Sequence, residues 1–132
     1  MRRRTFQQNK LWRDKTPSML EVTGSIIHRK HLDDAAYDQQ LRIKLLEEAD
    51  EVLKAKDQKA LIEELADVFE VIDALCLLHN ISRERVFAAQ AAKREHKGGF
   101  DTRLFVTLAE HLEGSFGEKY CLADPKKYPE VL

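Results

Sequence analysis

The feature that most constrains this chain is a pair of long apolar patterns with helical spacing, separated by a short polar break. In residues 33–56 the apolar side chains recur at intervals of three and four, the period of an α-helix. Residues 59–79 repeat the pattern over a broader apolar face. Asp33 or Asp34 can cap the first helix, and Asn80 is suited to end the second. The short connection predicts that these two helices pack antiparallel.

The remaining segments extend this prediction to an all-α fold. Ser82 can cap a third helix that ends at Gly98-Gly99, and we expect a fourth, shorter helix over residues 101–113. Five glycines and three prolines leave few places for turns, which favours long elements. The sequence therefore predicts a bundle of four to five helices.

A length of 132 residues fits one domain, so we expect a single all-α domain over residues 1–132. Within it, residues 1–8 are expected to be disordered. Residues 114–132 contain two glycines and two prolines and are expected to form an irregular C-terminal tail.

Charge and composition exclude several classes of protein. A net charge of -1, from 22 basic and 23 acidic side chains, argues against stable nucleic-acid binding. No apolar run approaches the roughly 18 residues that a membrane span needs, and no apolar stretch follows Arg2-Arg3-Arg4 as in a secretory signal. Cys76 and Cys121 lack a metal-binding spacing, so we expect a reducing, cytoplasmic compartment.

Carboxylates occupy positions on both long helices where apolar residues are expected. At about 100° per residue, Glu48 falls between Leu41, Leu45 and Val52, on the edge of the apolar stripe. Glu51 lies one turn further on, beside it. The first helix therefore directs two acids toward its neighbour.

The second helix shows the same anomaly more strongly. Glu64 and Asp67 share their sector with Val71, Leu75 and Leu78, a strip that is otherwise apolar. No basic residue lies three or four positions from Glu64 or Asp67, so no local helical ion pair can neutralise them. Burial of an ionised carboxylate is costly unless it is paired or binds a metal.

If the helices are antiparallel, Glu48, Glu51, Glu64 and Asp67 can converge. Two like charges at about 5 Å repel by roughly 3 kcal/mol at an effective dielectric of 20. A hard divalent cation would relieve this repulsion, and Mg²⁺ is the common one, with Mn²⁺ as a substitute. The alternative interpretation is a solvated acidic helix face in a charged bundle.

These residues resemble a known signature. Glu47-Glu48-x-x-Glu51 followed by Glu64-x-x-Asp67 is similar to the motif of the all-α NTP pyrophosphatase superfamily. That superfamily includes MazG proteins, dimeric dUTPases, dCTP pyrophosphatases and phosphoribosyl-ATP pyrophosphohydrolase. The blocks at residues 9–15 and 97–100 resemble a small branch that is MazG-like or phosphoribosyl-ATP-pyrophosphohydrolase-like, so the resemblance covers about residues 9–104.

The resemblance implies an activity and a site. The reaction would be hydrolysis of an NTP or dNTP to NMP and pyrophosphate, in the house-cleaning of non-standard nucleotides. Glu48, Glu51, Glu64 and Asp67 would be the metal ligands and the catalytic acids, and one of them would serve as general base. The resemblance also implies a homodimer or a dimer of dimers.

Cationic side chains are available for the phosphates. Lys93 and Lys97 share one face of the third helix with Gln90, and Gly98-Gly99 could admit a ligand close to the backbone. Arg13 and Lys15 add further positive charge, so we expect the substrate-binding residues to be Arg13, Lys15, Lys93 and Lys97. The alternative is that these last-turn cations only complement the helix dipole.

Three other functions compete with this interpretation. A di-iron bundle needs Glu-x-x-His pairs, and no glutamate here has a histidine three residues later. A non-catalytic, nucleotide-binding helical interaction protein would explain the helices but not the acids in the apolar strips. Phosphoribosyl-ATP hydrolysis remains an alternative that the sequence does not separate from NTP hydrolysis.

Overall fold

The computed structural model describes residues 2–132 of the chain. Met1, which belongs to the segment expected to be disordered, lies outside them. Residues 2–132 form five helices and no strand, which confirms the all-α prediction. The chain divides into two compact units, one ending at Lys93 and the other spanning Arg94–Leu132, and each is described by itself. The single domain over residues 1–132 stays a prediction.

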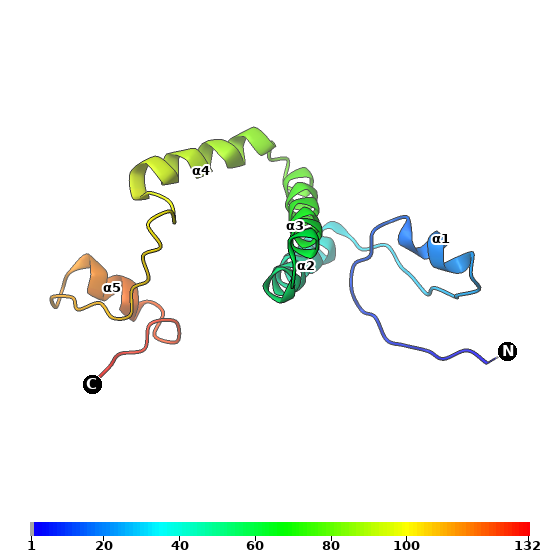
Figure 1. The fold of residues 1–132 in the computed structure, drawn as a ribbon, viewed down its shortest axis with the longest axis horizontal. Coiled ribbons are helices and arrows are strands. Elements are labelled where there is room, and N and C mark those ends of the chain that lie inside the picture. The colour runs from blue at the N-terminus through cyan, green and yellow to red at the C-terminus, as the bar shows by residue number, and fades with distance from the viewer. Residues whose placement is uncertain (1) are drawn as a thin grey trace. The chain divides into compact units, whose positions relative to one another are not determined.

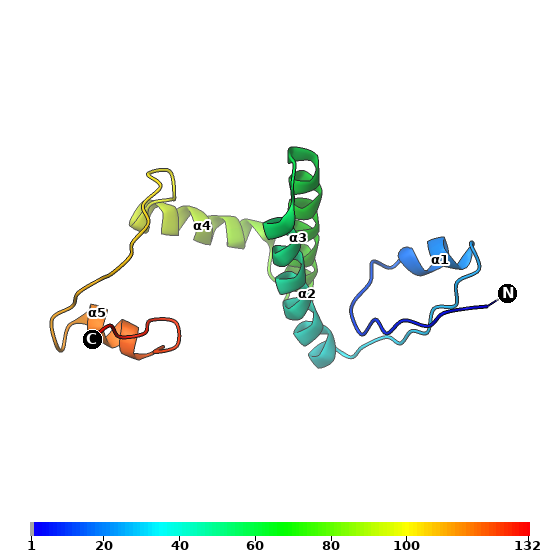
Figure 2. The same ribbon diagram turned by 60° about the horizontal axis from the view of Figure 1, so that its bottom comes forward.

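Two helices of equal length form the centre of the first unit. Helices α2 (Asp34–Lys54) and α3 (Gln58–Leu78) lie side by side and antiparallel, joined by residues 55–57 (Figures 1 and 2). Asp33 accepts a hydrogen bond from the Ala36 amide, as a capping residue does. The two predicted helices and their antiparallel arrangement are therefore confirmed.

The predicted boundaries after α3 are also found. Asn80 adopts a φ of 54°, a left-handed conformation that asparagine tolerates better than most residues, and the chain turns there. Ser82 accepts a hydrogen bond from the Arg85 amide at the start of α4 (Arg83–Lys97). Gly98 follows α4 with a φ of +82°, as a glycine that ends a helix commonly does.

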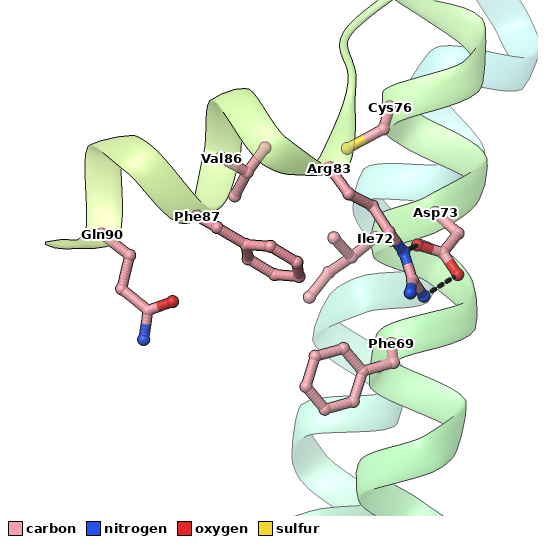
Figure 3. Close-up of a pocket in the computed structure, with 8 residues that line it drawn as sticks. All are labelled: Phe69, Ile72, Asp73, Cys76, Arg83, Val86, Phe87 and Gln90. Atoms are coloured by element: carbon pink, nitrogen blue, oxygen red, sulfur yellow. Dashed lines mark hydrogen bonds and ion pairs between the residues drawn. The ribbon is translucent and has the colours of Figure 1, made fainter.

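The junction between α3 and the first part of α4 is fixed by an ion pair. The Arg83 guanidinium donates two hydrogen bonds to the Asp73 carboxylate, of 2.6 and 2.5 Å. Beside this pair, Phe69, Ile72 and Phe87 line a cavity of about 190 Å³ (Figure 3). The two helices therefore meet through one polar clamp and an incompletely filled apolar contact.

Two predictions for the C-terminal part of the chain are wrong. Residues 101–113 do not form a helix, and their apolar side chains, such as Phe105 and Leu112, are exposed. A helix of this length is marginal in water without a surface to pack on. Helix α5 (Phe116–Leu122) instead lies in the segment expected to be irregular. Its signal is Ser115-x-x-Glu118, because Ser115 caps the helix and Glu118 accepts from the Gly114 amide.

Helix α1 (Thr16–Glu21) is short and has Pro17 in its first turn, where a proline costs no helical hydrogen bond. From Arg2 onward, the structure holds no helix that is both long enough and apolar enough to cross a bilayer.

The packed core of the first unit is small and lies between α2 and α3. Leu41 and Val71 are its buried apolar residues, and Glu48 is buried beside them. Cys76 is also buried but lines the cavity between α3 and α4. We call Glu64, Asp67, Val71, Leu75 and Leu78 the inner face of α3, and Ile62, Leu65, Phe69 and Ile72 its outer face. The inner face is buried or half-buried, whereas Leu65 and Phe69 of the outer face remain 41% and 55% exposed.

Candidate functional site

The site begins with the acids that interrupt the apolar strips. Glu48 is buried on α2, next to half-buried Leu45 and one turn before half-buried Val52. Glu64 and Asp67 are half-buried on the inner face of α3, above buried Val71. The wheel positions expected from the sequence are therefore the positions that the helices adopt.

Three of the four predicted acids meet. One carboxylate oxygen from each of Glu48, Glu64 and Asp67 lies within 4.8 Å of the other two. Glu51 is exposed and contributes no oxygen to this group. We call the three residues the acid cluster. The structure brings these three residues together, and the assignment of all four acids as metal ligands and catalytic residues stays a prediction.

Ionisation of Glu64 in the acid cluster is less favourable than in water. Desolvation raises the pKa of Glu64 above its ordinary value, and the charges of Asp67, Glu51 and Glu48 raise it further. Because the charged form is the disfavoured one, ionised Glu64 destabilises the fold at neutral pH. This destabilisation is relieved as the pH falls through the raised pKa.

A cation from a distant part of the chain approaches the acid cluster. The Arg13 guanidinium donates a hydrogen bond of 2.7 Å to the Asp67 carboxylate and lies 3.7 Å from the Glu70 carboxylate. Arg13 precedes Asp67 by 54 residues, so a search for helical neighbours could not find it. The available sequence signal was the block at residues 9–15, whose Arg13 was predicted to bind phosphate and not to pair with an acid.

A second group of cations surrounds the neighbouring acid of α2. Lys10 and Lys44 each lie 3.3 Å from the Glu47 carboxylate, and Lys44 is also 3.6 Å from Glu48. Partial burial raises the pKa of Glu47, but these hydrogen bonds and charges outweigh it and leave the pKa below the ordinary value. The N-terminal segment therefore contacts both acid-bearing helices, through Lys10 and Arg13.

The other predicted phosphate donors take no part in these ion pairs. Lys15 precedes α1, and Lys93 and Lys97 are on α4; all three are exposed, and none forms an ion pair within residues 2–132. Lys97 belongs to the second unit. Gln90, expected on the same face as Lys93, lines the cavity between α3 and α4. Their contact with phosphate stays a prediction.

The comparison with known families decides the class of the chain. Residues 26–94, just over half of the chain, match the family described as phosphoribosyl-ATP pyrophosphohydrolase. The chain belongs to this family. It is therefore a member of the all-α NTP pyrophosphatase superfamily, as its motifs predicted, and the family indicates a nucleotide pyrophosphohydrolase type of activity. No curated protein and no solved structure matches the chain.

The phosphoribosyl-ATP pyrophosphohydrolase match includes the whole acid cluster and Lys93, and it leaves out Arg13, Lys15 and Lys97. Members of this family typically depend on a divalent metal, and the acid cluster suits one. Oxygens that share a Mg²⁺ ion at about 2.1 Å lie at most about 4.2 Å apart, close to the 4.8 Å span found here. Carboxylate oxygens are also the ligands that a hard cation prefers.

Proposed function

We propose that the protein is a Mg²⁺-dependent pyrophosphohydrolase that converts an NTP or dNTP to NMP and pyrophosphate. The observation that supports this most is the acid cluster, in which three carboxylate oxygens from two helices lie within 4.8 Å of one another. Like-charged groups at such distances repel, so a site that keeps them together is suited to a cation. Mn²⁺ is the expected substitute metal.

We assign Glu48, Glu51, Glu64 and Asp67 as the metal ligands and catalytic acids. When bound, a divalent cation at this place supplies positive charge for the phosphates and makes water more acidic. The carboxylates of the chain hold that charge in position, and one of them accepts the proton of the water that attacks the α-phosphorus. Water attack at this atom breaks the bond to the β-phosphate and releases pyrophosphate.

Cationic side chains bind and orient the phosphates in this proposal. Arg13 lies beside the acid cluster, and a guanidinium suits two phosphate oxygens at once. Lys15, Lys93 and Lys97 are exposed and have no ion pair in the described part of the chain, so their charges are available. Binding of substrate would then exchange the Arg13–Asp67 contact for contacts to metal and phosphate.

A second candidate substrate is phosphoribosyl-ATP. The family match favours it, because the matched family is described by that activity. The bond that is cleaved is of the same kind, so the acid cluster serves both substrates equally. In the first candidate the biological role is removal of non-standard nucleotides.

The test is product analysis with purified protein. A panel of NTPs, dNTPs and phosphoribosyl-ATP is incubated with Mg²⁺ or with EDTA, and products are separated by ion exchange. We expect NMP or its phosphoribosyl equivalent, with pyrophosphate, in Mg²⁺ only, and the highest kcat/KM identifies the substrate. NDP and orthophosphate as main products would mean attack at the terminal phosphate and would contradict the proposal.

We further propose that the protein forms a homodimer, or a dimer of dimers, in the cytoplasm. The apolar outer face of α3 supports self-association, since Leu65 and Phe69 are large, exposed and adjacent along the helix. The two free thiols, Cys76 and Cys121, suit a reducing compartment.

A further inference from the structure

The N-terminal segments enclose a cleft of which the proposed function uses one residue, Arg13. It lies between residues 3–14 and residues 17–32, and the first turns of α2 close it at Tyr37 and Gln40. Its volume is about 1490 Å³. This exceeds the roughly 300–1,000 Å³ of ordinary small-molecule pockets, so the cleft has room for an extended ligand.

The charge of this cleft is strongly one-sided. Its lining includes a single carboxylate, Asp14, and six Lys or Arg side chains: Arg3, Arg4, Lys10, Arg13, Arg29 and Lys30. This excess contrasts with the net charge of -1 for the whole chain. We call it the basic cleft. A concave surface lined by one sign of charge focuses its field and concentrates ligands of opposite sign.

Half of these cations are already compensated by acids. Arg29 pairs with Glu21, Lys10 with Glu47, and Arg13 with Asp67. The other half have no carboxylate within 4.0 Å in residues 2–132. Arg3 donates to the Gly24 carbonyl, Arg4 stacks 5.3 Å from the centre of the Phe6 ring, and Lys30 is exposed. Arg3, Arg4 and Lys30 therefore supply the positive charge that remains for a ligand.

We propose that the basic cleft is a metal-independent binding site for a linear oligophosphate. Several separate cations along one cleft suit several linked phosphates better than a single compact anion, and guanidinium groups match phosphate oxygens in geometry. Lys10 and Arg13 belong both to the cleft and to the contacts with Glu47 and Asp67. A phosphate chain in the cleft is therefore held next to the acid cluster.

This inference extends the proposed function, in which the same phosphate chain is the substrate's triphosphate or the released pyrophosphate. It does not depend on the metal, because none of the three uncompensated cations contacts the acid cluster. The substrate's triphosphate carries a nucleoside and the released pyrophosphate does not. Tripolyphosphate, pyrophosphate and ATP are therefore compared as ligands. Equal affinity for tripolyphosphate and ATP identifies the phosphate chain as the part that is recognised.

The experiment measures binding of tripolyphosphate to the full chain in EDTA at low salt by titration calorimetry. Trp12, the only tryptophan, lines the cleft, so its emission reports the same binding independently. The variant Arg3→Gln/Lys30→Gln should bind about tenfold more weakly or worse, on the scale of lost charge-assisted contacts. The control Lys119→Gln/Lys126→Gln removes the same charge from the second unit and should bind as the wild type does.

Two further arms separate this site from the proposed active site. Glu64→Gln should lose hydrolysis and keep tripolyphosphate binding in EDTA. If tripolyphosphate binds and no nucleotide is cleaved, the basic cleft is supported as a binding site and the proposed function is contradicted. If nucleotide is cleaved but tripolyphosphate does not bind in EDTA, the proposed function is supported and the binding site is contradicted. Circular dichroism checks folding, and Lys30→Gln alone replaces the double variant if that variant is unfolded.

Three results would overturn the inference. The wild type does not bind tripolyphosphate in EDTA, or the control variant loses as much affinity as the cleft variant. The third is tight binding of a short single-stranded oligonucleotide with none of tripolyphosphate, which would assign the cleft to nucleic acid.

Discussion

The two faces of α3 show two different reasons why a helix carries the side chains that it does. The inner face packs on α2 and includes Glu64 and Asp67 among apolar residues, although buried carboxylates cost stability. The outer face has no polar side chain at Ile62, Leu65, Phe69 or Ile72, yet three of these large residues are 41% to 60% exposed. The proposed hydrolysis accounts for the acids of the inner face, and the proposed homodimer accounts for the apolar outer face.

The largest expected effect separates the four acids of the proposed site, two on α2 and two on the inner face of α3, from acids elsewhere on α3. Glu48→Ala, Glu51→Ala, Glu64→Ala and Asp67→Ala should each lower kcat by about a hundredfold or more, because metal or proton transfer is lost. Glu63→Ala and Asp73→Ala remove acids outside the inner face and should keep most activity. Steady-state kinetics with Mg²⁺ measure both sets. Equal losses in the two sets would contradict the assignment of the four acids to the site.

The next effect tests the outer face. Phe69→Glu places a charge on the apolar outer face and should shift the proposed homodimer to monomer, because a buried unpaired charge opposes association. Light scattering coupled to gel filtration measures the mass. Leu77→Glu is the control, because it makes the same change at a more exposed site outside the outer face and should leave the mass unchanged. An unchanged mass for Phe69→Glu would assign that surface to another role.

How much of the structure the sequence could predict depends on whether the deciding signals are local. The period of the apolar residues and the caps at Asp33 and Ser82 are local signals, so α2, α3 and α4 were predictable. The inner face was predictable too, because its acids contradict their apolar surroundings. The match of the chain to its family then agreed with the motifs that contain those acids.

The errors arose where the deciding contact is not local or where packing is absent. The Arg13–Asp67 contact joins residues 54 positions apart, and helical spacing cannot reveal such a pair. The sequence of residues 101–113 has apolar residues at helical intervals, but nothing in the second unit buries them. Helix α5 was missed because the prediction rested on the glycines and prolines of residues 114–132 and did not consider the cap at Ser115.

A smaller effect concerns stability and distinguishes two acids of the same face. Repulsion among the acids predicts that removing a charge raises the melting temperature in EDTA. Glu64→Gln should do so by a few degrees, because the pKa of Glu64 is raised by desolvation and by its acidic neighbours. Asp67→Asn should gain less or melt lower, since it also loses the hydrogen bond from Arg13.

Thermal-shift measurements in EDTA and in millimolar Mg²⁺ decide this comparison. Mg²⁺ should stabilise the wild type, because an ion that binds only the folded state shifts the equilibrium toward it, and it should stabilise both variants much less. Asp67→Asn melting higher than Glu64→Gln would mean that Arg13 does not hold Asp67 in solution. A response of neither wild type nor variants to Mg²⁺ would remove the acid cluster as a metal site.

The smallest effect concerns pH and the clamp between α3 and α4. The hydrogen bonds from Arg83 hold the pKa of Asp73 below its ordinary value, against a smaller opposing effect of desolvation. An acid with a lowered folded pKa stabilises the fold above its unfolded pKa of about 3.9, and this contribution is lost as the pH falls through the folded value. Arg83→Gln should therefore melt slightly lower than the wild type at pH 7, with the difference disappearing in strong acid. The pair is exposed to solvent, so salt should reduce the difference as well.

Arg85→Gln is the control, since Arg85 carries the same charge on α4 without an ion pair in residues 2–132. The pH dependence at the acid cluster has the opposite sign, because protonation of Glu64 relieves repulsion. As the pH falls from 7, the melting temperature of Arg83→Gln should approach that of the wild type from below, and that of Glu64→Gln should approach it from above. If both differences keep the same sign and size at every pH, ionisation of Asp73 and Glu64 does not account for their opposite effects on stability.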